Sequence, residues 1–127
     1  MITHLVDTDV MIDFFRGVLP AVDLISRSSD SIALSVITEA ELYAGVREGK
    51  ERHSIETFLN LVTIIPVNRA IAQKAGLYQS DFARATKIGM ADSIIAATAE
   101  TEKLQLLTLK IKHFPMLHDI QSPYQKS

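Results

Sequence analysis

The chain has no cysteine, and this absence removes several chemistries at once. Disulfide bonds, zinc–thiolate sites and thiol nucleophiles are all excluded. Long apolar runs are also missing, so no segment is long enough to cross a bilayer, and Asp7 interrupts a signal-peptide pattern at the N-terminus. We therefore expect a cytoplasmic protein with no membrane partner.

An excess of charge of either sign is missing as well. The formal net charge is −2, and charged residues make up 22% of the chain, so charge alone says little about partners. Carboxylates that hold a metal ion would offset a basic surface, and the near-neutral total therefore does not exclude a nucleic-acid substrate. The hydrophobic fraction of 47% is ordinary for a globular protein. We expect one domain over residues 1–127.

Short apolar runs alternate with segments of helical pattern along the whole chain. Strands are predicted at residues 2–6, 32–36, 63–66 and 104–109, with room for one edge strand after Phe114. Helices are predicted after Asp9 as far as residues 13–17, and at 20–27, 38–49, 50–61, 69–87 and 92–103. This alternation predicts a three-layer α/β/α sandwich with a central parallel sheet of four to five strands.

Three acids lie in separate apolar settings. They are Asp7 in the run HLVDTDV, Glu41 in VITEAEL and Asp92 in MADSIIAA. An ionised carboxylate beside apolar segments is costly unless a cation or hydrogen bonds compensate it, so one shared divalent ion is the economical explanation. Oxygen ligands without cysteine or paired histidines favour Mg²⁺ or Mn²⁺ over zinc.

The predicted fold brings these acids to one edge. Ligands of open α/β sheets sit outside the carboxyl ends of the strands, where Asp7 and residues 107–110 should lie. Glu41 and Asp92, near the starts of predicted helices, should point toward the same edge. Asp9 would face the opposite side of a continuing strand, so we assign it a supporting role. A metal ion at such a site polarises a phosphoryl oxygen and activates water, which favours phosphodiester hydrolysis as the reaction.

Each acid also has a purely structural interpretation. Asp7 would cap the helix that follows it, and Asp92 would complement the dipole of its helix. Glu41 would be the return arm of a capping box that starts at Thr38. The coincidence of all three acids in one predicted region favours a site.

Four segments together resemble a known family. They read LVDTDVMID at 5–13, SVITEAELYAG at 35–45, GMADSIIAATA at 89–99, and LTLK at 107–110 followed by HFP at 113–115. In order and spacing they resemble the PIN-domain family, specifically its VapC-type toxins.

The resemblance implies a Mg²⁺- or Mn²⁺-dependent endoribonuclease that is the toxin of a toxin–antitoxin pair. It assigns Asp7, Glu41 and Asp92 as the catalytic, metal-binding acids, with Asp9 in support; Thr38 stands beside them as a further supporting residue. It also implies a homodimer and a VapB-like antitoxin whose C-terminal segment lies in the active-site groove. RNA is the implied substrate.

Lys110 departs from the family pattern, which has an amide or an acid at this position. A lysine there would hold the scissile phosphate, replace a second metal ion, or neutralise the acids and weaken metal binding. The third outcome defines an alternative function, a catalytically impaired PIN-fold binding module. Lys112 and His113 extend a small basic run that would either touch RNA phosphates or lie in solvent.

Two other families share part of the pattern. The run from Asp7 to Val10 also resembles the first motif of haloacid-dehalogenase-like phosphatases, but the chain lacks the later pair of acids that those enzymes use. A phosphoacceptor receiver domain needs an aspartate after the third strand, and none occurs between Asp30 and Asp81. Both interpretations are weaker than the nuclease.

Overall fold

The computed structural model describes residues 1–118 and 120–125. Within them, one parallel sheet has the strand order β3-β2-β1-β4-β5. Its strands are β1 (His4–Val6), β2 (Ile32–Ser35), β3 (Thr63–Ile65), β4 (Gln105–Leu107) and β5 (Ile120–Gln121). The helices are α1 (Thr8–Phe15), α2 (Leu19–Ser28), α3 (Val36–Gly45), α4 (Lys50–Leu59), α5 (Arg69–Thr86), α6 (Met90–Glu102) and the short 3₁₀ helix η1 (Ile111–His113).

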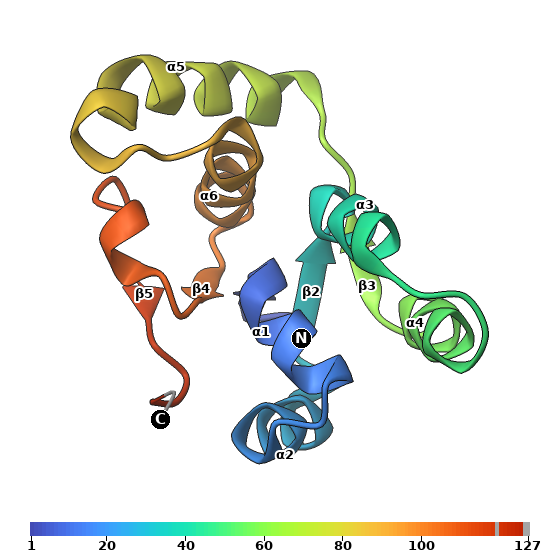
Figure 1. Cartoon of the computed structure of the whole chain (residues 1–127). Helices are drawn as coiled ribbons and strands as arrows, with labels where there is room; N and C mark the ends of the chain where they lie inside the picture. The colour runs from blue at the N-terminus through green and yellow to red at the C-terminus, as the bar shows by residue number, and fades with distance from the viewer. Residues whose placement is uncertain (119, 126–127) are drawn as a thin grey trace.

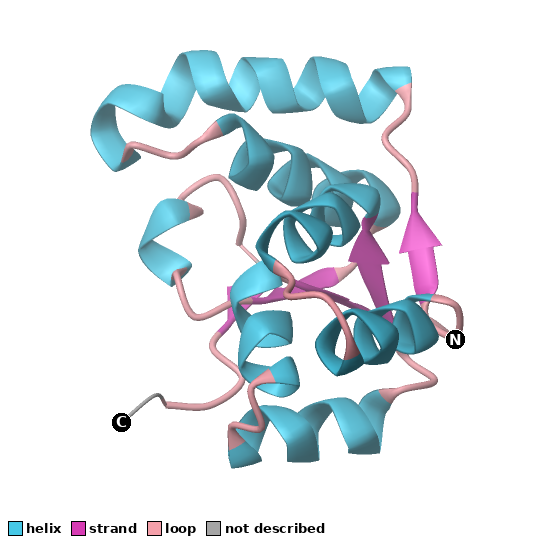
Figure 2. Cartoon of the chain, turned by 45° about the vertical axis from the view of Figure 1, so that its right-hand side comes forward, coloured by secondary structure: helices cyan, strands magenta, loops and turns pink. Residues whose placement is uncertain are grey.

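The two faces of the sheet bury different sets of side chains. Leu5, Ala33 and Leu106 share a core with side chains of α5 and α6. The alternate strand positions, among them Val6 and Leu107, pack with α1, α2, α3 and α4. Figures 1 and 2 show the strands between these helical layers, with α5 at the top and α2 at the bottom. The predicted three-layer α/β/α sandwich is confirmed.

The predicted capping box at the start of α3 is wrong. Ser35, the last residue of β2, is the N-cap, and its hydroxyl accepts a hydrogen bond from the backbone N–H of Ile37 at 3.0 Å. The helix therefore begins at Val36, two residues before Thr38, because a strand that ends in serine carries its own cap. It ends at Gly45 rather than residue 49, and Gly49 instead precedes α4.

Other boundaries shift by a few residues. The first strand begins at His4, and the fourth ends at Leu107 instead of residue 109. The sixth helix begins at Met90, so Asp92 lies inside its first turn. An edge strand does follow Phe114: β5 pairs with β4. Within the described residues, no helix is long and apolar enough to cross a membrane.

The strand order places a topological switch between β1 and β4. From β1 the chain first builds β2 and β3 on one side, and it later returns to place β4 and β5 on the other. Val6 and Leu107, the last residues of β1 and β4, are register partners. The segments that leave these two strands therefore start side by side, at the position where open α/β sheets bind ligands.

Candidate active site

Asp7 lies at this switch point and is fully buried. Its Oδ1 accepts a hydrogen bond from the backbone N–H of Thr8 at 2.7 Å, so it does cap α1. Its Oδ2 accepts a second one from the hydroxyl of Thr108 at 2.7 Å, across the switch. A helix cap explains only the first contact, and the second fixes the carboxylate between β1 and β4.

The surroundings of Asp7 oppose its ionisation. Burial and, to a smaller extent, the nearby charge of Asp9 together raise the pKa of Asp7 to about 6, against the opposing effects of Lys110 and the Thr108 hydroxyl. A carboxylate held in a site that penalises its charge is a typical feature of functional positions.

Asp9 lies on the same side as Asp7, and the expectation that it faces away is wrong. The strand ends at Val6, so Asp9 belongs to the first turn of α1 instead of a continuing strand. Its Oδ2 accepts a hydrogen bond from the backbone N–H of Leu109 at 3.1 Å. Its Oδ1 is buried and has no hydrogen-bond partner among the residues that the structure describes. Burial raises the pKa of Asp9 as well.

Two threonines link Glu41 to the site by hydrogen bonds. It lies in the middle of α3, not near its start, and is exposed. The Thr8 hydroxyl donates to Glu41 Oε1 at 2.7 Å and lies 2.9 Å from the hydroxyl of the buried Thr38. Because Thr8 donates its only hydroxyl proton to Glu41, Thr38 is the donor to Thr8. Thr38 thus orients the site instead of capping α3.

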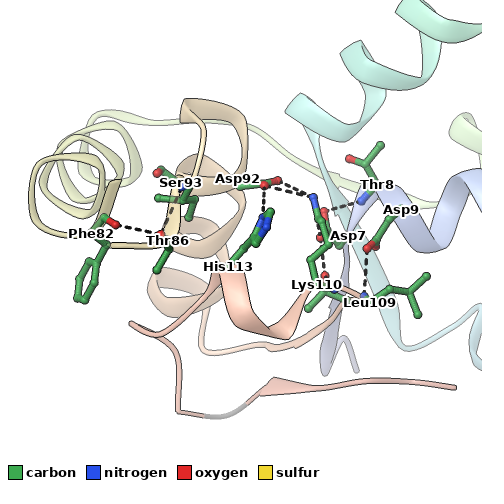
Figure 3. A network of polar contacts seen from close by, with 12 residues as sticks. Asp7, Thr8, Asp9, Phe82, Thr86, Asp92, Ser93, Leu109, Lys110 and His113 are labelled. Carbon is green, nitrogen blue, oxygen red and sulfur yellow. Dashed lines mark hydrogen bonds and ion pairs between the residues drawn. The ribbon is translucent and has the colours of Figure 1, made fainter. Parts of the chain in front are cut away.

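Asp92 faces Lys110 across the site (Figure 3). The Nζ atom of Lys110 lies 3.1 Å and 3.2 Å from the two Asp92 carboxylate oxygens, and 3.8 Å from Asp7 Oδ2. Although burial lowers the pKa of Lys110, the charges of Asp7 and Asp92 outweigh it and raise the pKa. His113 Nδ1 is 3.6 Å from Asp92 Oδ2 and has no hydrogen-bond partner within the described part of the chain.

The donor chemistry fits a hard divalent cation. Asp7, Asp9, Glu41 and Asp92 supply only oxygen, and the buried Oδ1 of Asp9 has no hydrogen-bond partner among the described residues. The positions of these side chains fit a metal ion less well than their chemistry does. In residues 1–118 and 120–125, no three acidic or histidine side chains form a group that could hold a metal ion between them. The ammonium of Lys110 lies between two of the predicted ligands.

Sequence reasoning assigned no role to Thr8 or Thr108. A threonine after a strand is ordinary turn chemistry, so neither stood out. The relevant signal was their position: Thr8 is the second residue after β1 and Thr108 is the first residue after β4, the two strands that meet at the switch. His113 was noted only as part of a basic run, yet its ring faces Asp92 (Figure 3).

Known proteins resemble this chain over nearly its whole length. Residues 4–110 match the PIN domain family. Ribonuclease VapC10 of Mycobacterium tuberculosis (strain ATCC 25618 / H37Rv) is 40% identical over 123 residues, which cover 94% of this chain and 92% of that protein. Ribonuclease VapC19 of the same strain is 36% identical over 124 residues, with coverages of 94% and 98%. A toxin–antitoxin complex from Klebsiella pneumoniae superposes with a TM-score of 0.84 at 27% identity, and covers 98% of this chain and 100% of that one.

This chain therefore belongs to the PIN-domain family, among its VapC-type ribonuclease toxins. The resemblance in the four sequence segments is confirmed. The phosphatase interpretation is wrong, because the match runs through the strands, helices and loops that hold Asp7, Glu41, Asp92 and Lys110 alike.

Proposed function

We propose that this chain hydrolyses RNA phosphodiester bonds with a Mg²⁺ or Mn²⁺ ion bound by Asp7, Glu41 and Asp92, as the toxin of a toxin–antitoxin pair. One observation carries this proposal. A buried carboxylate is fixed at the switch point of the sheet, and other acids from α1, α3 and α6 are oriented around it by hydroxyl, backbone and ammonium groups.

Each side chain has a defined task in this mechanism. The Thr8 and Thr108 contacts hold Asp7 in one orientation, so no reorganisation is needed when substrate binds. Thr8, steadied by Thr38, orients the exposed Glu41 toward the site. When bound, the ion polarises the scissile phosphate and lowers the pKa of an attacking water.

An antitoxin is the proposed regulatory partner. A groove of about 420 Å³ is lined by apolar side chains of α1, α3 and α4 together with Arg16, Arg47, Glu41 and Glu51. A peptide segment with apolar side chains, and with an acidic side chain to pair with Arg16 or Arg47, would fit this lining and cover the approach to Glu41. Homodimer formation is also proposed, and light scattering of the purified protein tests it.

Cleavage of an RNA pool tests the proposed activity. Purified protein is incubated with single-stranded and structured RNA in Mg²⁺, in Mn²⁺ and in chelator. We expect cutting in either metal and none in chelator. Glu41→Gln should remove most of the activity, whereas Glu39→Gln, the same change two residues earlier on α3, should not. Equal activity of the Glu41 variant and its control would remove Glu41 from the mechanism.

A binding module that does not cut is the second candidate function. Lys110 favours it, because an ammonium that pairs with Asp92 competes with a metal ion for the same oxygens. The metal-dependent cleavage assay separates the two candidates. Tight RNA or antitoxin binding without any cutting in either metal would support the module.

A further inference from the structure

The ammonium of Lys110 stands between two acids that the proposed function assigns to metal. It lies within 3.2 Å of both oxygens of Asp92 and 3.8 Å from Asp7 Oδ2. We propose that Lys110 is a built-in cation that takes the place of one divalent ion between Asp7 and Asp92, so that the chain binds a single divalent ion. This inference rests on the metal site of the proposed function and changes one of its ligands, because Asp92 pairs with Lys110 and Asp9 takes its place beside the ion.

The backbone holds Lys110 in this position. Its N–H donates to Thr108 Oγ1 at 3.0 Å, and the same hydroxyl donates to Asp7 Oδ2. The lysine stem therefore starts beside Asp7 and ends at Asp92. A lysine placed to contact a substrate phosphate would extend toward solvent, yet this side chain is only 34% exposed and its charge points inward (Figure 3).

Both oxygens of Asp92 are committed to the ammonium. A divalent ion at the same place would have to displace Lys110 or bind directly beside its positive charge, and like charges at such distances in a partly buried site repel strongly. Replacement of one ion by the lysine avoids both costs, since the ammonium supplies positive charge at the position where an ion would bridge Asp7 and Asp92.

Two acids that do not pair with Lys110 remain as ligands for one ion. Asp9 Oδ1 is buried and has no partner among the described residues. Glu41 is held by Thr8 and is not among the acids that pair with Lys110. Because these acids do not form a ready metal-binding group in the described residues, an ion would draw Asp9 and Glu41 toward Asp7 as it binds. Its charge, together with the ammonium near Asp92, would come close to balancing the four carboxylates.

Counting bound Mn²⁺ tests this inference without reference to activity. Equilibrium dialysis against saturating Mn²⁺, with electron paramagnetic resonance of the bound ion, gives the number of ions per chain. We expect one ion for the unmodified chain and two for Lys110→Asn. Lys110→Arg keeps the charge and should bind one. Lys112→Asn makes the same exchange on exposed η1, and should also bind one.

Each possible number of bound ions either supports this inference or overturns it. Two ions in the unmodified chain, or equal numbers in the unmodified chain and Lys110→Asn, would overturn the inference. No ion in the unmodified chain but one in Lys110→Asn would also overturn it, because the lysine would then block the site. Lys110→Met, which removes the charge without adding an oxygen, serves as the second variant if circular dichroism shows that Lys110→Asn is unfolded; it should likewise bind two.

The same samples separate this inference from the proposed function. If the count rises from one to two but no variant cuts RNA, the lysine replaces an ion in a site that is not a nuclease. If the unmodified chain cuts RNA in Mn²⁺ while both it and Lys110→Asn bind two ions, the proposed nuclease activity is supported and the proposed role of Lys110 is contradicted.

Discussion

Strands β1 and β4 carry an uncharged polar network at their amino ends and a charged one at their carboxyl ends. At the amino end, His4 and Gln105 are register partners, and His4 Nε2 lies 3.0 Å from Gln105 Oε1. Gln105 Nε2 in turn donates to Gln121 Oε1 at 3.1 Å, and Thr3 Oγ1 lies 2.7 Å from His4 Nδ1. At the carboxyl end, the same strands lead into Asp7 and its charged neighbours.

The difference shows which end serves the fold and which serves the chemistry. The amino-end network is built from hydroxyl, imidazole and amide groups that hold neighbouring strands together. The carboxyl-end network instead buries Asp7, raises its pKa and leaves Asp9 Oδ1 without a partner among the described residues. Functional sites commonly reduce stability in this way. The following experiments test this contrast, from the largest expected effect to the smallest.

Asp7→Asn should have the largest effect, because it removes the central charge of the site. We expect metal-dependent RNA cleavage to fall by roughly 10²–10³-fold, the scale of losing one positioned electrostatic group. The fold should persist, since the asparagine oxygen still accepts from the N–H of Thr8. Asp23→Asn on the surface of α2 is the control and should cut RNA normally. Normal cutting by the Asp7 variant would contradict the assignment.

The stability of the metal-free protein should fall as pH rises from about 4 to about 7. The folded state holds the Asp7 proton up to a pKa of about 6, above the ordinary value of 3.8, so it binds more protons than the unfolded state between these values. The loss from Asp7 amounts to about 3 kcal/mol. Urea unfolding in chelator measures it.

Asp7→Asn is the matched comparison for this pH dependence. The variant lacks the carboxyl group, so its free energy of unfolding should change less over the same pH range. A fall of equal size in both proteins would assign the effect to other groups, foremost Asp9, whose pKa burial also raises.

Thr38→Val should weaken the site without destroying it. The valine keeps the shape but removes the hydroxyl that steadies Thr8 beside Glu41. We expect a loss of about 10-fold in activity or metal affinity, the lower end for a residue that supports a ligand, and about 1 kcal/mol of stability. Thr98→Val, at a buried threonine whose hydroxyl donates to the Ile94 carbonyl of the same helix, is the control. Equal activity in both variants would leave Thr38 without a role in the site.

Gln105→Met should change stability alone. It removes the hydrogen bonds to His4 and Gln121 at the amino end, which should cost about 1–2 kcal/mol in the free energy of unfolding. The cleavage rate at a temperature where the variant is folded should match that of the unmodified chain. A large loss of cleavage would contradict the conclusion that the amino ends of these strands serve the fold and only the carboxyl ends serve the chemistry.

Much of the fold and of the candidate site follows from the sequence pattern. The apolar runs around Leu5, Leu34 and Leu106 predicted the inner strands, because buried parallel strands have a distinctive composition. Asp7 and the segment around Lys110 were correctly expected at the carboxyl edge. Boundaries were less accurate where a single residue decides them: Ser35 caps α3 because its hydroxyl reaches Ile37, which no periodicity reveals.

The sequence by itself determined the sandwich, the family and the residues that carry charge, since these depend on local hydrophobic period and on motifs in order. Only the tertiary structure decided how those residues meet. It turned Asp9 toward the site, made Thr38 part of a hydroxyl chain to Glu41, and directed Lys110 inward onto Asp92. Such contacts join residues 18 to 100 positions apart, and their geometry depends on strand order and register, which local sequence does not encode.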